Sequence, residues 1–189
     1  GRALWALGEC ARSDHDPSRR RWAAALFSEA LPAVESFSAP RAWSFTVLGL
    51  DSYCAAVAQD SNARRLRDLL AGRLITLFEA VQTNDWTWFE EGLAYDNARL
   101  CQALIVTGVS TGTPACVSAG LRSLRWLMTL QTTAAGFFRP VGSHSFGTTR
   151  VAPSYFDQQP LEAAAAISAC LAAWRADGDP QWKADAARA

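Results

Sequence analysis

The segment from Asp85 to Leu104 carries side chains suited to binding or cleaving a carbohydrate. Its sequence, DWTWFEEGLAYDNARLCQAL, gathers aromatic rings, carboxylates, an amide and a guanidinium. A core does not readily accept so many charges, and a solvated surface rarely exposes Trp and Phe beside them. Aromatic faces next to carboxylates suit a sugar, whose ring has apolar faces and whose edge carries hydroxyls. The segment therefore predicts part of a carbohydrate site.

Three carboxylates are the candidate catalytic groups: Asp96, Glu90 and Asp157. Glycoside hydrolysis uses an ionised carboxylate and a second carboxyl whose pKa is raised by an apolar setting. Helix N-termini favour anions, so Glu90 and Asp157 are expected to stay ionised. Asp96, flanked by Tyr95 and Ala98, is the expected acid. If the protein is an enzyme, we expect inverting hydrolysis or phosphorolysis of a glycosidic bond.

A second aromatic and polar cluster, YFDQQPLE at residues 155–162, also precedes a predicted helix. If the helices form hairpins whose first members point the same way, both clusters reach one rim, together with Arg41 and Trp43. A long loop is expected over residues 133–154, and its part 142–147, which contains His144, could lie over that rim. The residues expected to contact the ligand are Trp86, Trp88, Glu91, Tyr95, Asn97, Arg99, Gln158, Gln159 and His144.

The acidic residues of the first cluster also have structural interpretations. Glu90 and Glu91 would complement the dipole of a helix that begins near Gly92. Asp96 would pair with Arg99, three residues later on the same helix. Such a pair would lower the pKa of the carboxyl and oppose a role as the acid.

The remaining candidates have structural alternatives as well. Asp157 is a residue type that caps helices, and a helix is predicted to begin at Pro160. Trp86 and Trp88 would cover a core as readily as they would support a ligand. Gln158 and Gln159 have no such alternative and are the clearer indications of sugar contact.

Helical periodicity dominates the chain, and strand-like alternation is nearly absent. Small residues are frequent in the first, third, fifth and seventh predicted helices, while the others carry charged faces. Small residues allow close helix packing. The pattern predicts an all-α fold of antiparallel hairpins in inner and outer layers, a partial (α/α) toroid; a simple bundle is the alternative. The helices are expected near residues 1–12, 17–37, 40–58, 62–81, 92–107, 115–131, 160–176 and from 180 onward.

The composition limits the classes of function. Residues 1–189 are expected to form a single domain, and a formal net charge of zero argues against nucleic-acid binding. No signal peptide or apolar stretch of spanning length is present. The five cysteines are odd in number and lie in apolar helical patterns, which favours a reducing, cytoplasmic location. Without a CxxC pair or neighbouring histidines, neither a metal site nor a cofactor is predicted.

Two motifs are similar to those of a known family. The run WTWFEEGLAYDNARL at residues 86–100 resembles the six-hairpin glycosidase-like domain fused behind bacterial glycosyltransferases. The run FDQQPLEA at residues 156–163, and Trp182, are similar to later motifs of that domain. The resemblance implies a carbohydrate-active domain associated with a glycosyltransferase. A non-catalytic module that holds a glycan for the transferase is the alternative. A terpenoid-cyclase-like toroid is disfavoured because the DDxxD and DxDD motifs are absent.

The resemblance also implies a longer domain, so the chain is expected to be truncated at both ends. Missing hairpins would leave two helical edges exposed. Self-association through these edges, most simply as a homodimer, is then expected. The apolar residues predicted at the edges are Leu4, Trp5 and Leu7 on the first, and Leu161, Ile167, Leu171 and Trp174 on the second. The tryptophans Trp5, Trp22, Trp126 and Trp174 follow helical stripes and are expected in the core.

Overall fold

The computed structural model describes all 189 residues as eight α-helices, two short 3-10 turns and connecting loops, with no β-strand. The predicted all-α fold is confirmed. No helix combines the length and apolarity needed to cross a bilayer. The α-helices are α1 (Arg2–Ser13), α2 (Pro17–Ala30), α3 (Pro40–Ala56), α4 (Ser61–Val81), α5 (Ala98–Thr111), α6 (Pro114–Leu130), α7 (Pro160–Asp177) and α8 (Gln181–Arg188); the 3-10 turns are Leu31–Ser36 and Ser143–Ser145.

Local sequence signals set most helix boundaries. Four helices, α2, α3, α6 and α7, begin at a proline, whose fixed φ and missing N–H suit the first helical position. The side chains of Asp16 and Asp60 accept N–H bonds at the starts of α2 and α4. Gly112 and Gly178 end α5 and α7 in the left-handed conformation that glycine adopts without strain.

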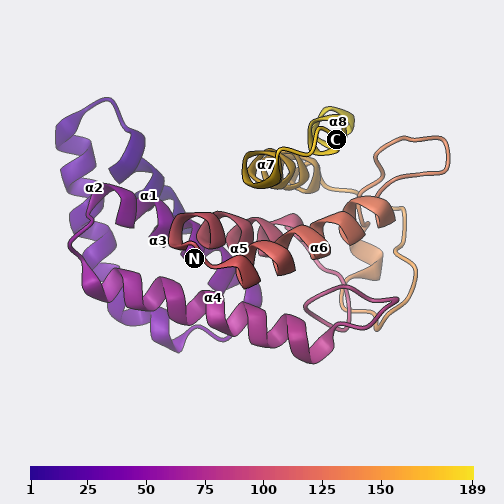
Figure 1. The fold of residues 1–189 in the computed structure, drawn as a ribbon, viewed down its shortest axis with the longest axis horizontal. Helices are drawn as coiled ribbons and strands as arrows, with labels where there is room; N and C mark the ends of the chain where they lie inside the picture. The colour runs from indigo at the N-terminus through magenta and orange to yellow at the C-terminus, as the bar shows by residue number, and fades with distance from the viewer.

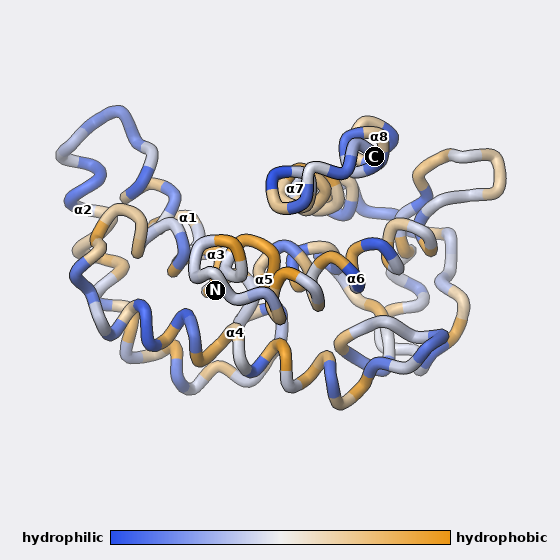
Figure 2. The backbone as a smooth tube through the Cα atoms, viewed as in Figure 1, coloured by the Kyte–Doolittle hydropathy of each residue, from blue (hydrophilic) through white to orange (hydrophobic).

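The odd-numbered helices form a continuous row in which α1 packs on α3, α3 on α5, and α5 on α7. Each even-numbered helix packs against the odd-numbered helix that precedes it. Figure 1 shows α3 and α5 in the middle, with α1 and α2 on one side and α7 and α8 on the other. The tube in Figure 2 is strongly hydrophobic along α3 and α5 and more polar along α2.

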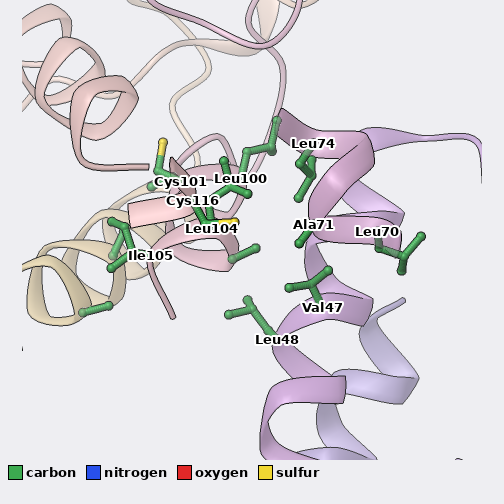
Figure 3. Close-up of a cluster of buried hydrophobic side chains, with 14 of the residues drawn as sticks. Val47, Leu48, Leu70, Ala71, Leu74, Leu100, Cys101, Leu104, Ile105 and Cys116 are labelled. Atoms are coloured by element: carbon green, nitrogen blue, oxygen red, sulfur yellow. The ribbon is translucent and has the colours of Figure 1, made fainter. Parts of the chain in front are cut away.

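The core lies where α3, α4 and α5 face one another. Figure 3 shows Val47 and Leu48 of α3 and Ala71 and Leu74 of α4 on the side that faces Leu100 and Leu104 of α5, with Cys116 of α6 near them. Leu50, Leu74 and Leu104 are fully buried. Each such side chain contributes about 1.5–3 kcal/mol by leaving water. The central helices are thereby held rigidly enough to position the residues at their ends.

Glycine allows α1 and α3 to pack backbone against backbone. A Cβ added to Gly8 would lie 2.2 Å from the carbonyl oxygen of Gly49, and one added to Gly49 would lie 2.6 Å from the carbonyl oxygen of Leu4. No side chain can share that space. The close packing expected from small residues in odd-numbered helices is therefore observed in this pair.

Two sequence-based expectations about the elements were wrong. The fifth helix begins at Ala98 instead of Gly92, because Asp96 has a positive φ of 53° that is incompatible with a right-handed helix. Glu90 and Glu91 therefore lie in the preceding loop and not in a first helical turn. Trp22 was expected in the core, but 61 % of it is exposed on α2.

The predicted apolar edges are only partly present. Leu4 is buried, because α1 lies against α3 along that face. The other six edge residues are partly buried, and three of them, Trp5, Leu7 and Trp174, pack against the core. Trp126 of the predicted core group is also partly buried.

Replacing Gly49 with alanine should separate α1 from α3. Gly49→Ala places a methyl group against the backbone of Leu4, and we expect the free energy of unfolding to fall by about 1–3 kcal/mol. Gly72→Ala is the matched control, because a Cβ at that position of α4 meets nothing within 4 Å. This control should be stabilising by about 0.5–1 kcal/mol. Urea denaturation of both variants measures the difference; equal effects would contradict the close packing.

Candidate functional site

The N-terminal ends of α1, α3, α5 and α7 meet through polar contacts. Arg2 of α1 forms an ion pair with Asp96 at 2.6 Å, and Arg41 of α3 donates to the side chain of Asn97 at 3.0 Å. Glu162 of α7 accepts from the side chain of Asn97 at 3.2 Å. We call this group the N-terminal rim: Arg2, Arg41, Glu90, Tyr95, Asp96, Asn97, Arg99 and Glu162. The expected meeting of odd-numbered helix starts is observed.

The loop that precedes α5 is folded by its own polar groups. The indole N–H of Trp86 donates to the carbonyl of Glu90 at 2.8 Å. Asn97 closes the loop onto Ala94, accepting its backbone N–H at 3.1 Å and donating back to its carbonyl. Asp96 between them takes the left-handed backbone conformation. These bonds give a segment without regular structure a fixed path to the rim.

Arg41 anchors this loop to α3. Its side chain is buried, and its guanidinium reaches Glu90 at 2.5 Å, the side chain of Asn97 and the carbonyl of Tyr95. A buried guanidinium without partners would be strongly destabilising. Because three different acceptors from one loop satisfy it, Arg41 fixes the relative positions of Glu90, Tyr95 and Asn97.

Glu162 anchors the same loop to α7. It is 2 % exposed, and its carboxylate accepts the backbone N–H groups of Asp96 and Asn97 as well as the Asn97 side chain. These N–H groups lie at the start of α5, where a helix cannot satisfy its own donors. Burial raises the pKa of Glu162, and the three donors partly offset that increase. Glu162 thus acts as a cap supplied by a different helix.

Asp96 is held between two arginines. Arg2 approaches its carboxylate at 2.6 Å, and Arg99 lies at 3.8 Å. The pairing with Arg99 expected from the i, i+3 spacing is therefore present, although Arg2 is the closer partner. Arg99 also donates to Gln102 at 2.6 Å and lies 4.6 Å from the ring centroid of Trp5. Burial lowers the pKa of the Arg99 guanidinium, with Asp96 opposing the change.

Tyr95 is the aromatic ring that the rim presents to solvent. The residue is 37 % exposed, and its ring centroid lies 5.2 Å from the Arg2 guanidinium and 5.3 Å from that of Arg41. Arg2 is itself largely exposed. An accessible ring, an accessible guanidinium and the partly exposed carboxylate of Glu90 thus lie together.

The loop before α7 joins the same region by its backbone. Gly147 donates to the carbonyl of Leu93 at 2.9 Å, and Arg150 donates to the carbonyl of Glu91 at 2.7 Å. The guanidinium of Arg150 also pairs with the Glu91 carboxylate at 2.6 Å. Glu91, expected to contact a ligand, is therefore engaged by this loop.

The candidates Asp157, Gln158 and His144 are exposed and Gln159 is partly buried, and all four lie outside the hydrogen-bond network of the rim. Asp157 has a positive φ of 57° and accepts from Ser143, so it does not cap α7. Gln158 donates to the carbonyl of Tyr155 at 3.0 Å. Gln159 directly precedes α7, and His144 is exposed in the 3-10 turn. The structure gives no hydrogen bond that joins these side chains to Asp96 or Glu90.

Trp86 and Trp88 do not present a ring to a ligand. Trp88 is fully buried and Trp86 is 8 % exposed. Both pack against Trp126, with ring centroids 4.9 and 5.7 Å away. Both rings cover the core, which is the structural alternative given for them above. The two tryptophan rings are buried because large aromatic side chains stabilise a fold most when they leave water.

Three charged residues that build the rim were not among the predicted site residues: Arg41 and Glu162 were expected near the rim without a role of their own, and Arg2 was missed. Each of them is one of the first three residues of an odd-numbered helix. A charged residue repeated at that position was the available signal, and for Glu162 it was obscured by the neighbouring glutamines.

No protein-family model matches the chain, and no curated protein matches it. The chemistry of the rim is clear from its contacts. Glu90, Asp96 and Glu162 are each engaged by guanidinium or backbone N–H donors. Such carboxylates can accept hydroxyl groups at their remaining lone pairs. Orientation of a polar ligand therefore suits this arrangement better than proton transfer.

Replacing Asp96 with asparagine should separate its structural from its chemical role. Asn tolerates the left-handed backbone, so Asp96→Asn removes the charge and keeps the conformation. Leaving Arg2 and Arg99 without this partner should lower the free energy of unfolding by about 1–3 kcal/mol. The exposed pair of Glu35 with Arg65 provides the control, and Glu35→Gln should change stability by less than about 0.5 kcal/mol. Unchanged stability with loss of turnover would instead identify Asp96 as catalytic.

The buried carboxyl of Glu162 should give stability a measurable pH dependence. Its folded-state pKa is raised above the ordinary value of 4.5. Its contribution is therefore complete below that value and is lost as pH rises through the raised pKa. Glu162→Gln removes the titration, so the stability of the unmodified protein should decrease relative to the variant above pH 4.5. Urea denaturation of both proteins over a pH series tests this. The pKa of Asp51 is also raised by burial, but Asp51 is present in both proteins, so its titration does not affect the difference between them. Curves of stability against pH that run parallel for the two proteins would contradict the prediction.

Proposed function

We propose that this protein binds a carbohydrate at the N-terminal rim. The observation that carries the proposal is the exposed Tyr95 ring, set between two guanidinium groups and beside carboxylates. A sugar can lie on the aromatic face while its hydroxyls reach Arg2 and Glu90. Both side chains keep exposed surface for this purpose.

The charges of the rim favour a neutral ligand. Its three arginines, Arg2, Arg41 and Arg99, are matched by three carboxylates, Glu90, Asp96 and Glu162. Asp96 lies near Arg2 and Arg99, and Glu90 pairs with Arg41; because the formal charges of the rim cancel, it has little net field to attract an ion. Recognition then depends on hydrogen bonds and on stacking, which is the chemistry that an uncharged sugar offers.

The non-catalytic role is the better supported of the two carbohydrate functions. Glycoside hydrolysis needs a carboxyl that can give its proton to the glycosidic oxygen. Glu162 has the raised pKa that such an acid requires, and this observation keeps hydrolysis or phosphorolysis as the second candidate. However, Glu162 is 2 % exposed, and its oxygens are occupied by donors of Asp96 and Asn97.

The helix arrangement supports two further parts of the proposal. A row of odd-numbered helices with even-numbered partners is the expected arrangement of a partial (α/α) toroid, as in the six-hairpin glycosidase-like domains that the motifs resemble. Such a domain would present a glycan to an attached glycosyltransferase. The partly buried apolar residues of α1 and α7, such as Trp5 and Trp174, are where a second copy would pack in a homodimer.

Removal of the Tyr95 ring should weaken glycan binding. A glycan array identifies ligands of the unmodified protein, and titration calorimetry compares variants with the strongest. We expect Tyr95→Ala to bind about tenfold more weakly, because stacking contributes roughly 0.5–1.5 kcal/mol beyond burial. Trp22→Ala is the matched control, since Trp22 is an exposed aromatic residue on α2 and should not affect affinity. Equal affinity of both variants would contradict the rim as the site. Release of reducing sugar, abolished by Glu162→Gln without loss of binding, would favour the catalytic candidate.

A further inference from the structure

A second hollow lies between α4, α5 and α6, near the C-terminal end of α5. Its volume is about 480 Å³, within the range of small-molecule sites. Ala71 and Ile75 of α4 form an apolar wall. The polar wall consists of Arg67, Asp68, Thr107, Thr111 and Thr113. We call this space the α4–α5 hollow.

Thr107 carries a buried hydroxyl group without a hydrogen-bond partner. The residue is 2 % exposed, and its Oγ1 makes no bond within the chain. Threonines in helices can donate to the carbonyl four residues earlier, as the buried Thr46 does to Ala42 and the partly buried Thr111 does to Thr107. An unpaired buried hydroxyl is destabilising, because it has given up its hydrogen bonds to water without a replacement. Since Thr107 lines the hollow, a ligand there can supply the missing partner.

Arg67 lines the same hollow with unused donors. The residue is 9 % exposed, and its Nε donates to Asp68 at 3.1 Å. Nη1 lies 4.0 Å from Asp51, which is too far for a hydrogen bond, and neither Nη atom donates elsewhere in the chain. A buried guanidinium is usually fully engaged, as Arg41 is at the rim. The hollow is therefore lined by a residue with an unpaired buried hydroxyl and by a guanidinium with unused N–H donors.

The charges around Arg67 decide which class of ligand fits. Asp68 and Asp51 lie on two sides of its guanidinium. Their combined charge exceeds that of Arg67, so the hollow does not attract a free anion. A neutral polyhydroxylated molecule can accept from Arg67 and donate to Asp68. Its apolar face can lie on Ile75.

We propose that the α4–α5 hollow binds a neutral polyhydroxylated molecule of the size of a monosaccharide or disaccharide. This site is separate from the N-terminal rim. The two sites lie near opposite ends of α5, about 20 Å apart for its 14 residues at 1.5 Å each. The proposal stands on Arg67 and Thr107 and does not depend on the rim.

The test is an amide chemical-shift titration of the folded chain. The probes are glucose, galactose, mannose, N-acetylglucosamine, maltose and inositol, with inorganic phosphate as the anionic comparison. At least one neutral probe should shift the amides of Thr107, Thr111 and Thr113 in a saturable way. Thr107→Val should weaken this binding about tenfold by removing one hydrogen bond. The variant should fold normally, because it removes an unpaired buried hydroxyl.

Two control variants assign the signal. Thr76→Val alters an exposed threonine of α4 that does not line the hollow and should leave the affinity unchanged. Tyr95→Ala should also leave it unchanged, because Tyr95 belongs to the rim. The proposal is overturned if no neutral probe shifts these amides, if phosphate alone does so, or if Thr107→Val binds as well as the unmodified protein. If glycan binding fails at the rim only, the binding at the α4–α5 hollow is still observed, so the experiments distinguish the two proposals.

Discussion

The capture of the α5 backbone by Glu162 is the interaction on which the site depends. Asp96 adopts a left-handed conformation just before α5, and this turn leaves its N–H and that of Asn97 directed away from the helix. Without an acceptor these groups would be buried and unsatisfied, at a cost that a small domain cannot easily bear. Glu162 supplies the acceptor, and Arg41 fixes the same loop from the opposite side. The position of Tyr95 follows from these two anchors.

The sequence predicted the elements well because their signals are local. Prolines at the starts of α3 and α7, and glycine at the end of α5, act through their own backbone conformations and need no knowledge of the fold. The start of α5 was misplaced by six residues because Asp96 carries no such signal. Its conformation is set by tertiary bonds to residues distant in sequence. Periodicity also misplaced Trp22, since it records a stripe without showing whether another helix covers it.

The sequence predicted which residues gather at the site, but not which of them contact one another. The sequence indicated that Glu90, Tyr95, Asp96, Asn97 and Arg99 would gather, and they do so at one rim. It did not show that Arg2 would approach Asp96 more closely than Arg99 does, because that contact crosses 94 residues of chain. Nor did it show that Trp88 would be buried while Tyr95 remained accessible. Aromatic residues in one segment can face opposite sides of a loop, and only packing decides which.

The distance in sequence between Asp96 and Glu162 has a consequence for how the chain acquires its structure. Sixty-six residues separate the donor from the acceptor. During synthesis the first turn of α5 therefore emerges long before its cap exists, and α5 must initially rely on its packing against α3, α4 and α6. Contacts of such sequence separation form late and slow folding, because the intervening chain must first be ordered. The arrival of α7 both extends the row of helices and fixes the rim, so the N-terminal rim takes its final form only in the last stage of folding.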